Sequence, residues 1–107
     1  METNRALKAL AALAQESRLA VFRLLVTRGA TGLAATKIAE ELGVPSSSLS
    51  FHLKELTHAG LIEPRQDGRF IIYAANFATM NALIAYLGEN CCGGLPCAPA
   101  LQAGSGR

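Results

Sequence analysis

The stretch that most constrains the fold is residues 35–58, which reads ATKIAEELGVPSSSLSFHLKELTH. Apolar residues recur in it at the spacing of one helix face on either side of Gly43-Val44-Pro45, where Gly and Pro favour a tight turn. The segment therefore predicts a helix-turn-helix whose apolar faces pack on a common core. The apolar positions concerned are Ile38, Leu42, Leu49, Leu53 and Leu56.

The sequence around this unit predicts a winged helix-turn-helix, mainly α with a small β-hairpin wing. Residues 4–14 and 76–88 have helical apolar spacing, and a central helix is expected to start at a Ser17 cap and to stop at Gly29. Two β-branched and aromatic runs flank Gln66-Asp67-Gly68, and Asp-Gly between such runs is a strong hairpin signal. An extra helix thus lies at each end of the winged unit.

The chain carries more apolar residues than one small domain can easily bury. Half of its 107 residues are hydrophobic and only 17% are charged, so we expect a homodimer that covers part of this surface. The last helix has an apolar seam and is expected to form the interface together with the first helix. The predicted interface residues are Leu7, Leu10, Phe77, Met80, Ile84 and Leu87.

Composition also limits the class of protein. No apolar run approaches the roughly 20 residues that span a membrane, and the N-terminus reads as an amphipathic helix headed by Glu2 rather than as a signal peptide. Three cysteines, an odd number without an export signal, predict reduced thiols in a cytoplasm. The net charge of +2 permits nucleic-acid binding without establishing it.

Most of residues 6–87 resembles the ArsR-type metalloregulatory repressors. The pattern S-x-x-x-S-x-H-L-x-x-L-x-x-A-G-L-I is matched from Ser46 to Ile62, and ESRLAVFRLL upstream is similar to the second helix of that family. The resemblance implies a homodimer that binds double-stranded operator DNA through the second helix of the helix-turn-helix. Base-facing positions of that helix would be Ser46, Ser47, Ser50 and Phe51.

The base-facing positions leave two alternatives open. Serine hydroxyls can donate to or accept from any base edge, but Ser46–Ser48 could also be only a cluster that caps the helix. Phe51 departs from the polar residue often found at its position in the family. It either contacts a thymine methyl or is covered by the adjacent helix.

The remaining candidates for DNA contact are basic residues and one histidine. Lys54 and two arginines of the wing, Arg65 and Arg69, would pair with phosphates and add affinity without sequence information. Arg69 is the stronger of the two candidates in the wing, because it lies beside the projecting turn. His52 falls at the border of the core, where a base contact and a structural hydrogen bond are both open.

All the cysteines lie in one short segment, Glu89–Cys97, which reads ENCCGGLPC. Thiolates select soft ions, and three of them without a fourth donor suit an ion that takes three ligands and keeps a lone pair. Arsenite and antimonite fit this description, whereas zinc prefers four ligands. Gly93-Gly94 lets the chain reverse and Pro96 fixes its return, so one chain can form a site from Cys91, Cys92 and Cys97.

Other ligand sites of the family are missing from this chain. Many members carry a cysteine pair in the first helix of the helix-turn-helix, but residues 32–38 hold no thiol. Other members bind zinc between the last helices through His and Asp or Glu, and Asn76–Gly88 holds none of these. What remains resembles the arsenite-responsive subgroup with C-terminal cysteines.

The sequence therefore predicts a repressor that releases its operator when trivalent arsenic or antimony binds, with no organic cofactor. A thiol-redox or persulfide switch that uses Cys97 with Cys91 or Cys92 stays open, as does incidental clustering of the thiols. A zinc or cadmium sensor would need Glu89, a backbone oxygen, water or the second subunit as a further ligand.

An enzyme is not expected, since a catalytic thiol usually lies in Cys-x-x-Cys at the start of a helix and this pair follows one. The predicted division of the chain is a DNA-binding and dimerisation domain over 1–90 and a cysteine-containing segment with a flexible tail over 91–107.

Overall fold

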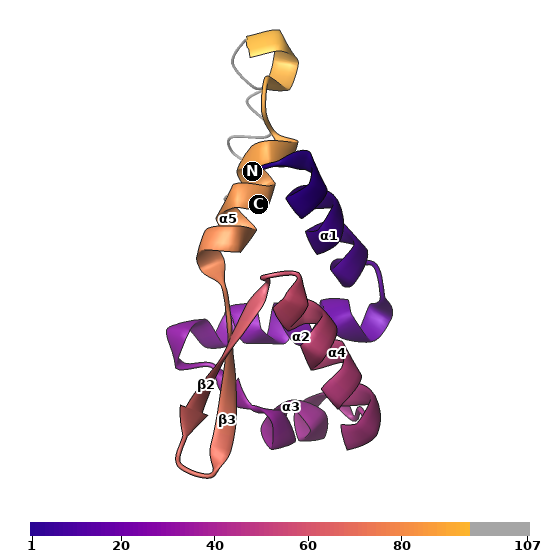
Figure 1. Cartoon of the computed structure of the whole chain (residues 1–107), viewed down its shortest axis with the longest axis vertical. Coiled ribbons are helices and arrows are strands. Elements are labelled where there is room, and N and C mark those ends of the chain that lie inside the picture. Colours follow the sequence, from indigo (N-terminus) through magenta and orange to yellow (C-terminus); the bar gives the residue numbers. More distant parts are fainter. Residues whose placement is uncertain (95–107) are drawn as a thin grey trace.

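The computed structural model describes residues 1–94, which form a winged helix-turn-helix with one further helix at each end (Figure 1). Its helices are α1 (Thr3–Leu13), α2 (Glu16–Arg28), α3 (Ala35–Leu42), α4 (Ser46–His58) and α5 (Phe77–Leu87), with 3₁₀ turns η1 (Gly29–Thr31) and η2 (Cys91–Gly94). The strands β1 (Leu33–Ala34), β2 (Ile62–Asp67) and β3 (Phe70–Ala75) form an antiparallel sheet in the order β1-β3-β2. Pro96, Cys97 and the predicted tail lie outside the described residues.

The helix-turn-helix is confirmed as α3 and α4. Helix α3 ends where Gly43 adopts the left-handed conformation that a residue with a side chain rarely takes. Pro45 caps α4, and no serine side chain bonds to the free amides of its first turn, so the view of Ser46–Ser48 as only a capping cluster is wrong. The apolar positions face the core as predicted: Ile38, Leu49, Leu53 and Leu56 are buried, and Leu42 is half-buried.

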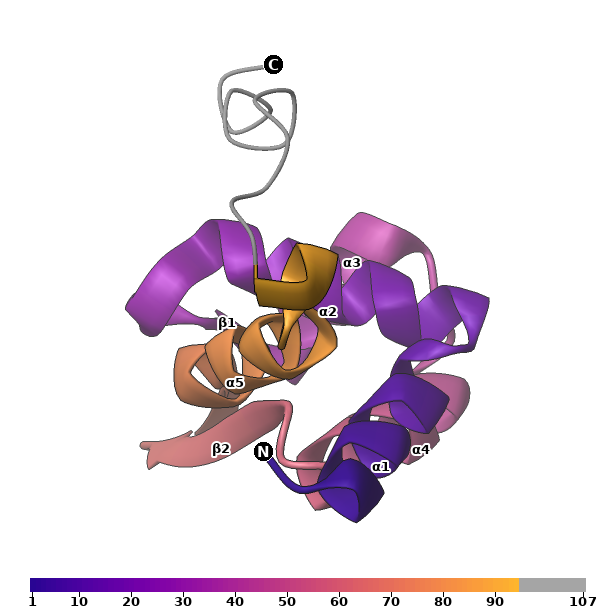
Figure 2. The same cartoon turned by 90° about the horizontal axis from the view of Figure 1, so that it is seen from above.

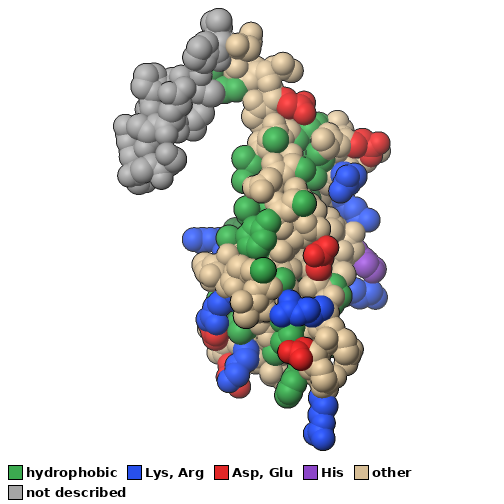
Figure 3. Space-filling view, turned by 90° about the vertical axis from the view of Figure 1, so that its left-hand side faces the viewer, with side chains coloured by type: hydrophobic (Ala, Val, Ile, Leu, Met, Phe, Trp, Pro, Cys, Tyr) green, Lys and Arg blue, Asp and Glu red, His purple; other side chains and the backbone are tan. Residues whose placement is uncertain are grey.

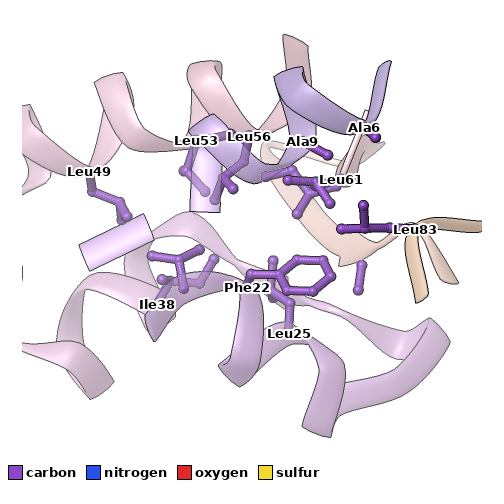
Figure 4. Close-up of a cluster of buried hydrophobic side chains, with 14 residues drawn as sticks. Ala6, Ala9, Phe22, Leu25, Ile38, Leu49, Leu53, Leu56, Leu61 and Leu83 are labelled. Carbon is purple, nitrogen blue, oxygen red and sulfur yellow. The ribbon is translucent and has the colours of Figure 1, made fainter. Parts of the chain in front are cut away.

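Helix α2 is central to the core, although not on all sides. Figure 4 shows Phe22 and Leu25 on one side of the cluster and Leu53 and Leu56 of α4 on the other, with the two groups pointing toward one another. Leu19, on the outer side of α2, keeps 43% of its surface exposed. The helix starts one residue before the predicted cap, because the Gln15 side chain, not Ser17, accepts a hydrogen bond from the first turn.

The wing is confirmed as the β2–β3 hairpin, with a turn shifted along the chain from the predicted one. Asp67 pairs with Phe70, so the loop is Gly68-Arg69 and not a turn around Gln66-Asp67-Gly68. Gly68 has a φ of 62°, which suits the first position of a two-residue hairpin loop.

The short strand β1, which the sequence did not predict, joins the other edge of β3. A side-chain carbon added at the preceding Gly32 would lie 2.4 Å from the Tyr73 carbonyl oxygen, so only glycine allows this approach.

Helices α1 and α5 lie side by side at the end of the molecule opposite the wing tip (Figures 1 and 2). The Thr3 Oγ1 and Tyr86 Oη atoms, 2.6 Å apart, join the start of α1 to the last turn of α5. The buried residues of α1 are all alanines, and α5 buries Thr79 and Leu83. No helix within residues 1–94 combines the length and the apolar character that a membrane span requires.

Candidate nucleic-acid interface and thiol segment

Helix α4 presents a polar face because its three leucines hold the opposite face in the core. Ser46, Ser47, Ser50 and Lys54 are all exposed. The Ser50 hydroxyl donates to the Ser46 carbonyl at 3.1 Å, which leaves its oxygen lone pairs to accept from a donor outside the helix. Phe51 is 56% exposed, so the alternative in which the adjacent helix covers it is wrong for this chain.

His52 is half-buried at the border of the core and has two structural neighbours. Its Nδ1 lies 3.4 Å from Nη1 of Arg18 on α2, and its ring meets the edge of the Phe51 ring at a centroid distance of 5.8 Å. The structural hydrogen bond left open by the sequence is therefore present. A contact between His52 and a base stays a prediction.

Arg18 is a residue of this region that sequence reasoning missed. Its Nε donates to the Ala12 carbonyl at 2.7 Å, its backbone amide donates to the Gln15 side chain, and its guanidinium reaches His52. Arg18 thus joins the end of α1, the start of α2 and the middle of α4. No pattern in the sequence distinguishes it from the other arginines of α2.

The wing presents its two arginines differently. Arg65 donates to the carbonyls of Ala30 and Thr31 at 3.3 and 2.9 Å, which holds the middle of β2 against η1. Arg69 lies in the two-residue loop and has no hydrogen bond or ion pair within residues 1–94. Pairing of either side chain with phosphate stays a prediction. Of the two arginines, Arg69 is the one whose guanidinium makes no hydrogen bond within residues 1–94, so all of its donors can bind a phosphate.

The wing tip also exposes an apolar pair that the sequence did not single out, Phe70 and Ile71, at 56% and 44%. The hairpin tip and the first turn of α4 lie at the same end of the molecule (Figure 1). On the face that Figure 3 shows, Lys and Arg side chains lie over this lower half with Asp, Glu and hydrophobic side chains among them, and one Lys or Arg projects beyond its end, whereas hydrophobic side chains run along the upper half.

The predicted interface residues divide into two groups. Leu7, Leu10, Ile84 and Leu87 are 58%, 38%, 60% and 60% exposed. Phe77 and Met80 are instead half-buried, because they pack against the core of their own chain. Helices α1 and α5 therefore expose an apolar surface, which we call the terminal seam. It is made of Leu7, Leu10, Ile84 and Leu87.

The thiol segment begins directly beyond α5, at the end of the molecule opposite the wing tip (Figure 1). The Cys91 amide donates to the Gly88 carbonyl, and the Sγ atoms of Cys91 and Cys92 lie 3.4 Å apart. Cys92 has a φ of 57°, a left-handed conformation that is strained for a residue with a side chain.

Because Cys97 lies outside the described residues, the three-thiolate site stays a prediction. Within residues 1–94, no three His, Cys, Asp or Glu side chains converge as metal ligands. In this part of the chain, Glu89 does not complete a zinc site with the cysteine pair.

Comparison with known proteins identifies the class of this chain. Residues 13–65 match the family model for a helix-turn-helix domain. The chain is 38% identical over 58 residues to YceK of Bacillus subtilis strain 168, an uncharacterised regulator of the helix-turn-helix type, and the match covers 54% of this chain and 57% of YceK. It is 31% identical to the transcriptional regulator YgaV of Escherichia coli strain K12, over 73% of this chain and 77% of YgaV.

Solved structures give the same answer. An ArsR-like transcriptional regulator from Rhodococcus sp. RHA1 is 30% identical, with a TM-score of 0.70 over 78% of this chain and 76% of that chain. The chain belongs to the ArsR-like transcriptional regulators. It is also 30% identical to a possible transcriptional regulator for arsenical resistance, with a TM-score of 0.61 over 76% of this chain and 84% of that one.

A further ArsR-like structure shows the shared fold at lower identity. The winged helix-turn-helix fragment of Mb0332 from Mycobacterium bovis, described as homodimeric, is 24% identical, with a TM-score of 0.64 over 89% of this chain and 88% of that fragment. The resemblance of the sequence to this family is therefore confirmed, and so is the winged-helix fold. The assignment to the arsenite-responsive subgroup stays a prediction.

Proposed function

We propose that this regulator is a homodimeric repressor that binds operator DNA with α4 and the wing, and releases it when trivalent arsenic or antimony binds the C-terminal thiols. The observation that carries the proposal is the cysteine pair at the end of α5. It places two sulfurs 3.4 Å apart next to a helix that holds half of the terminal seam.

The separation of the two sulfurs supports a shared soft atom. It is far longer than the roughly 2.05 Å of a disulfide bond. Two bonds of about 2.3 Å can reach both sulfurs from one shared atom, because their summed length exceeds this separation. The preference for a pyramidal ion comes from the number of thiols, since Cys97 would supply the third and last thiolate. One similar solved structure is itself described as a possible transcriptional regulator for arsenical resistance.

The exposed side chains support the DNA-binding surface and the dimer. Serines, Phe51 and Lys54 on α4 and Arg69 on the wing lie at one end of the molecule, where a reading helix and a phosphate-binding loop can meet one duplex. The terminal seam lies at the other end and is apolar, and the related fragment Mb0332 is a homodimer. A dimer through this seam would set two α4 helices at a fixed spacing for a pseudo-palindromic operator.

The position of the thiols suggests how release would occur. A ligand that closes the segment beyond Leu87 would pull on the last turn of α5, which contacts α1 through the Thr3–Tyr86 hydrogen bond. The terminal seam is formed by these two helices, so a shift there changes the spacing of the reading helices. Ligand and DNA then favour different conformers, and each weakens the binding of the other.

Operator binding tests the proposal directly. Duplexes enriched by the protein from a random pool would serve as fluorescent probes, and anisotropy would be titrated with arsenite, antimonite, zinc and peroxide. We expect release by arsenite and antimonite from the wild type but not from Cys91→Ser, Cys92→Ser or Cys97→Ser, each of which should still bind DNA. X-ray absorption of the arsenic-loaded protein should report three sulfur neighbours.

The results separate the alternatives. Release by peroxide with no response to arsenite would establish the thiol-redox switch in place of the arsenic sensor. Release by zinc alone, with nitrogen or oxygen neighbours at the metal, would point to a site completed elsewhere. If no duplex is enriched over the random pool, the DNA-binding part of the proposal is wrong.

A further inference from the structure

Within residues 1–94, the polar groups of Arg18 contact more helices than those of the other side chains discussed above. Its Nε bonds the Ala12 carbonyl in the last turn of α1, at 2.7 Å, and its Nη1 lies 3.4 Å from His52 on α4. The Gln15 side chain fixes the backbone from which it projects. A planar guanidinium can hold such partners in a fixed geometry, and Arg18 connects the end of α1 to α4 in this way.

The packing of α1 against the core does little to fix its position along its own axis. Its buried residues are Ala6, Ala9 and Ala12, which form a smooth face, and the one large side chain of α1 that packs against the core is the half-buried Leu13 in the last turn. Displacement along such a face costs less repacking than displacement of interlocked side chains would. The position of α1 therefore depends strongly on its end contacts, Thr3 with Tyr86 at one end and Ala12 with Arg18 at the other.

We propose that Arg18 is a positioning residue that couples α1 to the reading helix through His52. The inference rests on the proposed function and names the contact through which a change at the terminal seam reaches the DNA-binding surface. Since the ring of His52 meets that of the exposed Phe51, Arg18 also fixes the place of an aromatic side chain on the DNA-facing side.

The coupling predicts a response in α4 that requires no DNA and no arsenic. In the ¹⁵N-labelled protein, Arg18→Gln should move the amide resonances of residues 49–54 and the Nδ1 resonance of His52, while the thermal midpoint stays close to that of the wild type. The matched control is Arg23→Gln, which removes the same charge from the exposed side of the same helix, where Arg23 has no hydrogen bond or ion pair within residues 1–94. We expect that variant to leave α4 unchanged.

Operator affinity gives the second measurement. Arg18→Gln should weaken binding to the enriched duplex by about tenfold, or about 1.4 kcal/mol, and Arg23→Gln by much less. Arg18→Lys should not restore binding, because a point charge lacks the guanidinium geometry. In a His52→Gln background, Arg18→Gln should cause little further loss, since the two residues act through one contact.

The outcomes decide the inference. It is overturned if α4 responds equally to Arg18→Gln and Arg23→Gln, or if the losses of Arg18→Gln and His52→Gln simply add. If Arg18→Gln fails to fold, His52→Gln alone removes the imidazole that Arg18 contacts and keeps the bond to Ala12, and it should shift the amide resonances of the neighbouring α4 residues and give the same loss of operator affinity. If the wild type enriches no duplex, the proposed function fails, and the resonances of α4 still decide whether Arg18 positions that helix.

Discussion

Replacing Ile84 with alanine should weaken the proposed dimer without unfolding the subunit. A fully buried Ile or Leu side chain contributes about 1.5–3 kcal/mol relative to an exposed one. Ile84 keeps 60% of its surface exposed in the single chain, so a partner that covers it would gain about 1–1.5 kcal/mol per subunit. Both copies change in a homodimer, so we expect a loss of about 2–3 kcal/mol, or about 30- to 150-fold in the dissociation constant.

Sedimentation of a dilution series under reducing conditions would measure this constant, since reduction removes any disulfide between subunits. The matched control is Leu19→Ala, which removes an exposed apolar side chain from α2, outside the terminal seam. Circular dichroism should show unchanged helix content for both variants. If Ile84→Ala and Leu19→Ala dissociate at the same concentration as the wild type, the terminal seam is not the interface.

Three further predictions concern stability and coupling. Gly32→Ala should lower the free energy of unfolding in urea by about 2–3 kcal/mol, because its new carbon would meet the Tyr73 carbonyl. The loss should exceed that of Gly29→Ala, since Gly29 has a similar φ but open space around it. Equal losses in the two variants would refute this reason. Leu56→Ala should cost about 2–5 kcal/mol in the same assay, since Leu56 is fully buried, and a smaller loss would mean that the core collapses around the cavity. Tyr86→Phe removes the bond to Thr3, so it should keep arsenite affinity in calorimetry but weaken release of the operator; unchanged release would exclude this hydrogen bond from the coupling.

The helix-turn-helix could be predicted because several local signals agree there. The spacing of Leu49, Leu53 and Leu56 fixes which face of α4 is buried, and the Gly43 and Pro45 positions fix where one helix stops and the next begins. The same agreement located the wing. Where two residues give similar local signals, the prediction misses by a residue or two, as for the cap of α2 and the hairpin loop. For α2, the choice between Gln15 and Ser17 as the cap depends on side-chain geometry.

Features that depend on distant parts of the chain could not be predicted. Strand β1 has only two residues, too few for a pattern, and it exists because Gly32 allows the backbone to approach β3. Phe77 and Met80 are half-buried because they pack against the core of their own chain, which the spacing of apolar residues along the helix cannot show. Arg18 belongs to the same class, because its role comes from Ala12 and His52, which are six and 34 residues away.

The arrangement of the molecule limits how any ligand at the thiols could affect DNA binding. The thiol segment lies at one end of the molecule, and the start of α4 and the wing tip lie at the other. Helices α1 and α5 lie between the thiol segment and the half of the molecule that holds α4 and the wing. The 11 residues of α1 alone span about 16 Å, roughly twice the distance over which charges are screened at physiological ionic strength. A change of charge at the cysteines is therefore too weak to act on the duplex directly. In the proposed mechanism the signal therefore passes through contacts, and the hydrogen bonds at the two ends of α1 offer a continuous route from Tyr86 to α4.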